Sequence, residues 1–262
     1  MTDLSKPPSY PLSHNLLKDK NIVITAAAGS GIGFATAKRC IEEGAKVLIS
    51  DIHEKRLNEA ALKLNNDTGY LPSTFVCDVT NSIQVNDLIS KAKEILGSID
   101  VLINNAGLGG FSSVREMTDT QWEKVLNVSL TGTFKVSRAA LNHMEQNKNG
   151  VIVNNASVLG WRAQANQSHY SAAKAGIMAF TRSSAIEAAE FGVRINAVSP
   201  SIAIHDHLAK TNSQDLLDEL SAKEVFGRAA EPWEIANVII FLASEYSSYM
   251  TGEIISVSSQ HP

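Results

Sequence analysis

The segment NIVITAAAGSGIG, residues 21–33, decides the fold. An apolar, β-branched run ends near Thr25, a glycine-rich turn follows, and a helical pattern continues to about Glu43. Glycines allow a tight turn and the close approach of a pyrophosphate, and the helix offers free N–H groups and the positive end of its dipole. Such turns also close strands for purely structural reasons, and the spacing is not G-x-G-x-x-G, so the segment alone leaves both interpretations open. The candidate phosphate-binding residues are Gly29, Ser30, Gly31, Ile32 and Gly33.

Six further runs of the same kind follow along the chain. They are short and apolar without strict alternation, as expected for strands covered on both faces, and they lie at residues 45–50, 73–77, 101–103, 151–153, 193–198 and 253–257. Amphipathic helical stripes separate several of them, for example at 57–64, 85–96 and 235–242. This alternation predicts a single α/β domain with a Rossmann-type, doubly wound parallel sheet of seven strands and helices on both faces.

No linker or repeat divides the 262 residues. We therefore expect a short arm at 1–16 and one domain at 17–262. The longest irregular stretch, about 201–230, is expected to form a substrate lid, because long insertions in compact domains are often lids. Short helices are indicated within it by Leu208, Leu216, Leu217 and Leu220.

The composition excludes several classes of protein. A chain that is 44% hydrophobic and 19% charged is not disordered, and its net charge of −4 offers no basic excess for nucleic acid or an anionic membrane. Cys40 and Cys77 are too few for a disulfide scaffold and are interpreted as buried, reduced thiols, which favours a cytoplasmic protein. The apolar runs are short and the first 17 residues lack an apolar core, so we expect neither a transmembrane helix nor a secretory signal.

Two carboxylates follow the second and third β-like runs. Asp51 lies 20 residues after Gly31, the spacing at which an acidic side chain can bind adenosine ribose hydroxyls. A carboxylate would repel a 2′-phosphate, so Asp51 predicts NAD(H) rather than NADP(H), a preference that the nearby Lys55 and Arg56 soften. Asp78 fits a contact with the adenine edge. The alternative for both residues is capping of the helix that follows.

A catalytic constellation follows from the spacing of four further residues. Tyr170 and Lys174 are four residues apart in SHYSAAKAG, so on a helix they share one face. A phenol has a pKa of about 10, and a neighbouring ammonium would lower that pKa and make Tyr170 a usable proton donor or acceptor. Ser157, 13 residues earlier, can place its hydroxyl on a substrate oxygen, and Asn127 can hold a water that links the lysine to solvent.

With these residues in this order, the chain resembles the short-chain dehydrogenase/reductase family in its single-domain form, over about residues 17–257. Asn127, Ser157, Tyr170 and Lys174 match the catalytic positions, residues 104–107 look like the family's N-N-A-G, and residues 196–200, 227–228, 241–244 and 251–252 resemble its later motifs. The resemblance implies further dinucleotide contacts at Val79, Asn105, Ala106, Gly107, Tyr170, Lys174, Pro200, Ser201 and Ala203.

The chain also departs from the family pattern. Ala26 and Ala27 replace the usual Thr-Gly opening of the phosphate loop, so Ala27 must tolerate the turn or the loop differs in shape. Ser201 stands where a glycine is usual, His205 where a threonine is usual, and residues 257–260 replace Val-Asp-Gly-Gly. None of these changes removes a catalytic group.

The resemblance implies hydride transfer between C4 of a nicotinamide and a carbonyl carbon. Tyr170 would protonate the carbonyl oxygen, Ser157 would steady it, and Lys174 would bind the nicotinamide ribose. The stretch at 153–176 looks like a subgroup associated with bacterial breakdown of steroid-derived rings and acyl-CoA intermediates, which favours a bulky apolar ketone or secondary alcohol. The alternatives are an NADPH-dependent 3-oxoacyl-thioester reductase and a non-catalytic dinucleotide sensor.

Several other residues keep two interpretations. Trp161 suits an apolar pocket wall or packing against the lid, and Arg162 suits a carboxylate or carrier phosphate or, more simply, solvent. His205 and His207 lack further ligands, so we expect no metal site. The family resemblance implies a homotetramer in which the helix near 171–189 and the stretch 118–145 pair across a dimer, with the C-terminal strand at a second interface.

Overall fold

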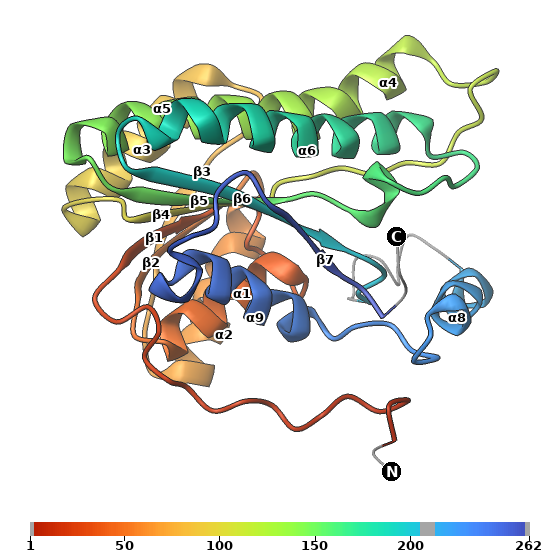
Figure 1. The fold of residues 1–262 in the computed structure, drawn as a ribbon, viewed down its shortest axis with the longest axis horizontal. Coiled ribbons are helices and arrows are strands. Elements are labelled where there is room, and N and C mark those ends of the chain that lie inside the picture. The colour runs from red at the N-terminus through yellow and green to blue at the C-terminus, as the bar shows by residue number, and fades with distance from the viewer. Residues whose placement is uncertain (1–2, 205–212, 260–262) are drawn as a thin grey trace.

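Seven parallel strands form one sheet in the computed structural model, which describes residues 3–204 and 213–259 (Figure 1). The order is β3-β2-β1-β4-β5-β6-β7, and each predicted run is a strand whose ends lie within two residues of those expected. The strands are β1 (Asn21–Ile24), β2 (Lys46–Asp51), β3 (Ser73–Val76), β4 (Val101–Asn104), β5 (Gly150–Asn155), β6 (Val193–Pro200) and β7 (Ile254–Val257).

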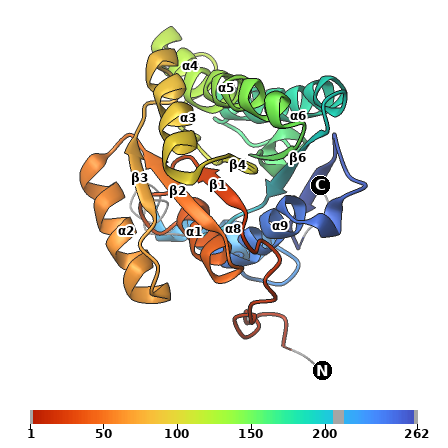
Figure 2. The same ribbon diagram turned by 90° about the vertical axis from the view of Figure 1, so that its left-hand side faces the viewer.

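Helices cover both faces of the sheet (Figures 1 and 2). One face carries α1 (Ile32–Glu42), α2 (Glu54–Thr68) and α9 (Pro232–Ala243), and the other carries α3 (Ser82–Leu96), α5 (Gly132–Asn147) and α6 (Ser168–Ala189). Successive residues of β1 enter different apolar clusters: Ile22 and Ile24 belong to one, and Val23 to the other. Burial on both faces is why the strand sequences lack alternation.

The shorter elements lie between the main ones. They are α4 (Asp119–Leu126), the π-helical turn η1 (Asn127–Thr131), the 3₁₀ turns η2 (Val158–Gly160) and η3 (Glu245–Ser247), and α8 (Gln214–Lys223). The turn η1 joins α4 directly to α5, so the three form one continuous stretch beside α6 (Figure 1).

The strand order reverses at β1, which pairs with β2 on one side and β4 on the other. In open parallel sheets the crossovers diverge at such a point, and a crevice forms outside the carboxyl ends of the strands. The residues just after β1, β4 and β5 therefore meet at one edge of the sheet, where the sequence analysis places the dinucleotide and the catalytic residues.

The N-terminal arm, of which residues 3–16 are described, is fastened to the end of α1 by a buried ion pair. Glu43 is fully buried, and its carboxylate accepts N–H bonds from His14 at 2.9 Å and Leu16 at 3.0 Å. The Arg39 guanidinium donates to the same carboxylate at 2.6 Å. The chain enters the core directly afterwards, at the fully buried Leu17.

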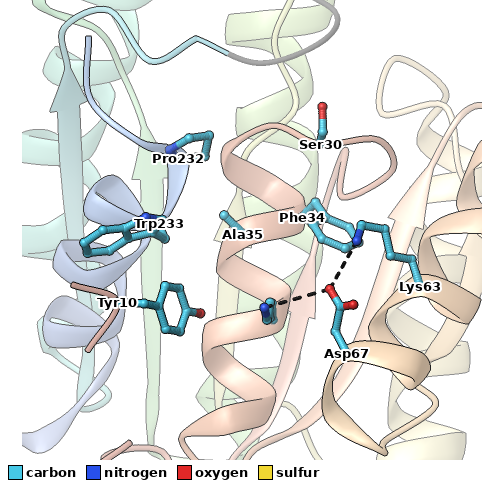
Figure 3. A pocket seen from close by; sticks show the side chains of 9 residues that line it. Tyr10, Ser30, Phe34, Ala35, Lys63, Asp67, Pro232 and Trp233 are labelled. Atoms are coloured by element: carbon cyan, nitrogen blue, oxygen red, sulfur yellow. Dashed lines mark hydrogen bonds and ion pairs between the residues drawn. The ribbon is translucent and has the colours of Figure 1, made fainter. Parts of the chain in front are cut away.

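Tyr10 attaches the middle of the arm to two helices. Its ring lies edge-on to that of Trp233 of α9, with centroids 5.4 Å apart (Figure 3). Its hydroxyl donates to Glu42 at 2.7 Å. The two rings and the outer side of α1 bound a cavity of about 240 Å³. Its two lysines both pair with Asp67 (Figure 3). Ser30 of the candidate phosphate loop also lines it, but Ser157, Tyr170 and Lys174 do not, so we assign this cavity no part in proton transfer.

The two ends of the stretch 201–230 lie side by side, because a parallel bridge joins Ala203 to Ala230. Its described part contains α8, which carries Leu216, Leu217 and Leu220 as expected. The other residues singled out there, His205, His207 and Leu208, lie outside the described residues.

We predict that Glu43→Ala lowers the free energy of unfolding by about 3–5 kcal/mol, because it removes the fully buried one of the two carboxylates that pair with Arg39 and leaves the His14 and Leu16 N–H groups without their acceptor. The control is Glu245→Ala, which breaks the exposed Lys20–Glu245 pair and should change stability by less than about 1 kcal/mol. Urea unfolding followed by circular dichroism measures both, and equal losses would contradict the assignment.

Candidate active site

The turn after β1 has the backbone of a phosphate-binding loop, with its left-handed positions at Ala26 and Gly29. Their φ angles are 50° and 95°. The Ala26-Ala27 replacement left two expectations, that Ala27 tolerates the turn or that the loop differs in shape. Ala26, and not Ala27, has the positive φ, and Ala27 donates its N–H to the Ser50 carbonyl. A non-glycine residue in this region costs about 1–2 kcal/mol, so the surrounding contacts must hold it there.

Those contacts come from the turn after β4. The hydroxyl of the buried Thr25 accepts N–H bonds from Asn105 at 3.0 Å and Ala106 at 3.1 Å. The Asn105 amide donates to the Ala26 carbonyl at 2.9 Å. A Cβ on Gly33 would lie 2.4 Å from that carbonyl oxygen and from the Asn105 Nδ2, so only glycine fits. Sequence reasoning did not assign Thr25 to the site; its place directly before the loop was the available signal.

The two predicted carboxylates lie beside this loop, and neither is the N-cap of its helix. Asp51 is 8% exposed and accepts N–H bonds from Ala28 at 3.3 Å and His53 at 3.0 Å. Burial raises the pKa of Asp51, and the Ala28 hydrogen bond opposes that rise. Asp78 accepts both the N–H and the hydroxyl of Thr80 at 2.8 Å. The capping alternative is therefore wrong, because the N-caps of α2 and α3 are His53 and Asn81.

Ser157, Tyr170 and Lys174 meet at the carboxyl end of β5. The Ser157 and Tyr170 hydroxyls share a hydrogen bond, and the Ser157 Oγ also accepts the Leu159 N–H at 3.2 Å. Both Tyr170 and Lys174 are on α6, and the lysine Nζ lies 5.5 Å from the centroid of the phenol ring. The expected common face is confirmed. The same Nζ donates to the Asn155 carbonyl at 2.6 Å.

The remaining dinucleotide candidates border this cluster. A Cβ on Gly107 would lie 3.4 Å from the Lys174 Nζ, which places that glycine directly beside the catalytic lysine. Pro200 ends β6, Ser201 donates its N–H to the Val257 carbonyl at 3.1 Å, and Ala203 is in the bridge to Ala230. Val79 is different: its side chain is buried and packs against Gly132, so only its backbone can face a ligand.

Known proteins share this arrangement. A family model described as "Enoyl-(Acyl carrier protein) reductase" matches residues 26–259. A solved structure, that of a short chain dehydrogenase from Mycobacterium smegmatis, is 55% identical and superimposes with a TM-score of 0.88, covering 99% of this chain and 100% of that one. The chain belongs to the short-chain dehydrogenase/reductase family. It is therefore an oxidoreductase, and the predicted fold class and family are confirmed.

Two relatives with named activities cover nearly the whole chain. One, from Mycobacterium tuberculosis, is named "(5R,7aS)-5-hydroxy-7a-methyl-1-oxo-2,3,5,6,7,7a-hexahydro-1H-indene-carboxyl-CoA reductase" and is 60% identical over 99% of this chain and 100% of its own length. The other, the cis-4-hydroxycyclohexanecarboxylate dehydrogenase of Sinomonas cyclohexanicum, is 38% identical over 91% of this chain and 95% of its own.

The loop of this short-chain dehydrogenase/reductase fits the dinucleotide that the family binds. A Cβ on Gly29 would meet nothing within 4 Å, so the loop is open on that side. Within the described chain, α1 begins at Gly31 without a side-chain cap and with no acidic residue in its first turn. Its free N–H groups and dipole are therefore available to a pyrophosphate. None of the helices described is long and apolar enough to cross a membrane.

Burial shifts the pKa values of Tyr170 and Lys174 in opposite directions. It raises the pKa of Tyr170, with the Ser157 hydrogen bond as the opposing effect, and it lowers the pKa of Lys174 to about 8. The lowering of the Tyr170 pKa expected from Lys174 does not prevail, because desolvation of the phenol dominates. The phenol is therefore protonated at neutral pH and holds a proton that a carbonyl oxygen can receive, although a raised pKa makes it a weaker acid than a free phenol.

The role expected of Asn127, holding a water that links Lys174 to solvent, stays a prediction. Asn127 is exposed at the start of η1, and two residues later Ser129 is fully buried. Successive helical side chains differ by roughly 100°, so residues two apart face nearly opposite directions. The Ser129 hydroxyl accepts the Leu108 N–H at 3.0 Å and donates to the Leu108 carbonyl at 3.2 Å. Ser129 thus anchors the loop after β4, a role that sequence reasoning missed.

We predict that Ser129→Ala lowers kcat/KM for a ketone substrate roughly tenfold, because two hydrogen bonds that position the 108–112 loop are lost. The paired variant Asn127→Ala should stay within about twofold of the parent. Steady-state kinetics on both proteins checks this, and the reverse order would show that Asn127 is the positioning residue.

A second prediction concerns Lys174. Between pH 8 and about 10.4 the folded protein has lost the lysine proton while the unfolded chain retains it, so this group makes the free energy of unfolding rise with pH in that window. The variant Lys174→Met lacks this contribution. Its stability relative to the parent should therefore be greatest below pH 8 and decline by pH 9.5 in urea unfolding. A difference that is the same at both pH values would contradict the buried, low-pKa lysine.

Proposed function

We propose that this enzyme interconverts a secondary alcohol and a ketone on a bulky, apolar ring system carried as a CoA thioester, using NAD(H). The hydrogen-bonded Ser157–Tyr170 pair beside Lys174, at the switch point of the sheet, carries the proposal. The substrate class is supported by the printed activity of the relative that is 60% identical over the whole chain. The ring alcohol in the name of the Sinomonas enzyme agrees with it.

The chain's own residues handle the proton and the orientation. When bound, the nicotinamide supplies the hydride in reduction and accepts it in oxidation. Tyr170 holds the proton that the carbonyl oxygen receives, and the Ser157 Oγ, fixed by the Leu159 N–H, directs its own proton at the same oxygen. Lys174, held by the Asn155 carbonyl beside Gly107, is placed for the nicotinamide ribose. Each such donor is commonly worth ~10²–10³ in rate.

The cofactor preference depends on Asp51. Its carboxylate stands at the end of β2 and accepts two backbone N–H groups, an arrangement that leaves lone pairs for ribose hydroxyls. A 2′-phosphate would meet this negative charge. The residues 26–33, Asp78, Asn105 to Gly107 and 200–203 complete the binding site that we propose.

An NADPH-dependent 3-oxoacyl-thioester reductase remains the second candidate function. The description of the family model favours an acyl thioester, and Arg56, whose guanidinium lies 3.9 Å from Asp51, offsets part of the repulsion of a 2′-phosphate. The non-catalytic sensor loses its support, because Ser157, Tyr170 and Lys174 are all present and assembled.

Paired kinetics test the function directly. The purified protein is titrated with NADH and NADPH, and initial rates are measured on cyclic ketones, including bicyclic ring acids as CoA esters, and on 3-oxoacyl thioesters. Tight NADH binding with turnover of the cyclic ketones is expected. NADPH preference with turnover of the linear thioesters alone would establish the second candidate instead.

We predict that Asp51→Ala raises the Kd for NADH roughly tenfold or more and changes the Kd for NADPH by no more than about twofold, because charge-assisted hydrogen bonds to the ribose are lost. Nucleotide fluorescence titration measures both, with Asp87→Ala on the exposed side of α3 as the matched control. Equal weakening of both nucleotides would contradict the assignment to NAD(H).

We also propose a cytoplasmic homotetramer of D₂ symmetry. The outer face of α5 and α6 exposes Phe134 and Ile186, at 40% and 76%, and Arg138 lies over the Phe134 ring at 4.8 Å. Apolar side chains left on a helix pair are covered when a second copy packs there. Sedimentation equilibrium at micromolar concentration should give four chains per particle. Phe134→Lys should lower that number, and a monomeric parent would contradict the proposal.

A further inference from the structure

The turn that opens α6 carries a buried polar side chain that the reaction above does not use. Gln167, the N-cap of α6, is only 8% exposed. Its amide oxygen is shielded from solvent and accepts no hydrogen bond from any residue that the structure describes. A buried polar atom without a partner costs about 1–3 kcal/mol, so such a group next to a catalytic tyrosine calls for a ligand.

The position of Gln167 relative to the catalytic pair follows from helix periodicity. Gln167, Tyr170 and Lys174 are spaced by three and four residues, so they form one stripe along α6. Lys174 is at the end of this stripe that meets Gly107 and the Asn155 carbonyl, where the dinucleotide candidates gather. Gln167 is therefore one turn beyond Tyr170 on the opposite side, away from the dinucleotide and toward the substrate.

The loop after β4 covers this turn and keeps water away from it. The Ser112 N–H donates to the Asn166 carbonyl at 3.0 Å, which ties the loop to the residue before Gln167. A Cβ on Gly110 would lie 2.8 Å from the ring of the buried His169, and one on Gly109 would lie 3.9 Å from the Tyr170 ring. The two glycines let the loop lie close against the first turn of α6, between the buried Gln167 and the phenol ring.

We propose that Gln167 binds a second, neutral oxygen of the substrate, on the side of the reacting carbonyl away from the dinucleotide. The unpartnered atom is the amide oxygen, an acceptor, so it matches a ring hydroxyl, which can donate to it, and neither a ketone nor a carboxylate, which only accept. The inference rests on the proposed function, and the name of the Mycobacterium tuberculosis relative carries both a hydroxy and an oxo group on one ring system. Gln167 is then a specificity-determining residue that orients the ring before proton transfer from Tyr170.

The test compares two substrates and two proteins. The substrates are bicyclic ring ketones as CoA esters, one with and one without a hydroxyl on the second ring. The parent enzyme should favour the doubly oxygenated substrate roughly tenfold or more in kcat/KM, because a site built to hydrogen-bond a substrate group rejects the analogue that lacks it. Gln167→Met, which keeps the length of the side chain, should bring that ratio close to one.

Two further variants make the result interpretable. Gln146→Met, on the exposed side of α5, should keep the parent's ratio. Gln167→Leu also removes the amide oxygen, so it should abolish the preference for the ring hydroxyl as well, and it serves if the methionine variant does not fold. A ratio unchanged by Gln167→Met or Gln167→Leu, or a parent that shows no preference while turning over both substrates, would overturn this inference alone. Turnover of neither substrate with either nucleotide would overturn the proposed function and this inference with it.

Discussion

The buried hydroxyl of Thr25 is the interaction on which the active site depends. It accepts two N–H groups from the turn after β4 and so fixes the turn after β1 against it, at the point where the strand order reverses. The hydrogen bonds continue across the sheet: Asn105 donates to the Ala26 carbonyl, Asn155 donates to Asn105, and Lys174 donates to the Asn155 carbonyl. One network of hydrogen bonds thus links the phosphate loop to α6 across the ends of three neighbouring strands, β1, β4 and β5.

This continuity couples the conformation of the phosphate loop to the placement of the catalytic pair. Ala26 is held with a positive φ that few non-glycine residues adopt, and its carbonyl is the acceptor that orients Asn105. At the other end of this hydrogen-bond network, Lys174 and Tyr170 are buried, and desolvation moves their pKa values apart: the pKa of the lysine falls to about 8 and that of the phenol rises. Burial, which the packing of α6 against the sheet imposes, therefore keeps the phenol protonated at neutral pH, so that it holds the proton that a carbonyl oxygen can receive.

Local sequence was sufficient for the features that depend on spacing along one element. Seven strands, the carboxylate after β2 and the shared face of Tyr170 and Lys174 all follow from such spacing. It was insufficient where partners come from distant segments. Asn127 and Ser129 are two residues apart, and only the packing of η1 against the loop after β4 decides which of them faces inward. The same holds for Thr25, Asn155 and Gln167, whose roles depend on neighbours 19 to 80 residues away or on what encloses them.

The proposed function depends on one chemical step, in which a hydride is transferred to a carbonyl carbon while Tyr170 donates a proton to the carbonyl oxygen. Its most direct test is a single-turnover reaction of a bicyclic ring ketone, as its CoA ester, with NADH in which both hydrogens at C4 of the nicotinamide are deuterium. Mass spectrometry should recover deuterium at the new carbinol carbon, and Tyr170→Phe should slow its appearance at least ~10²-fold. Unlabelled alcohol, or transfer at the parent rate in the phenylalanine variant, would contradict the account.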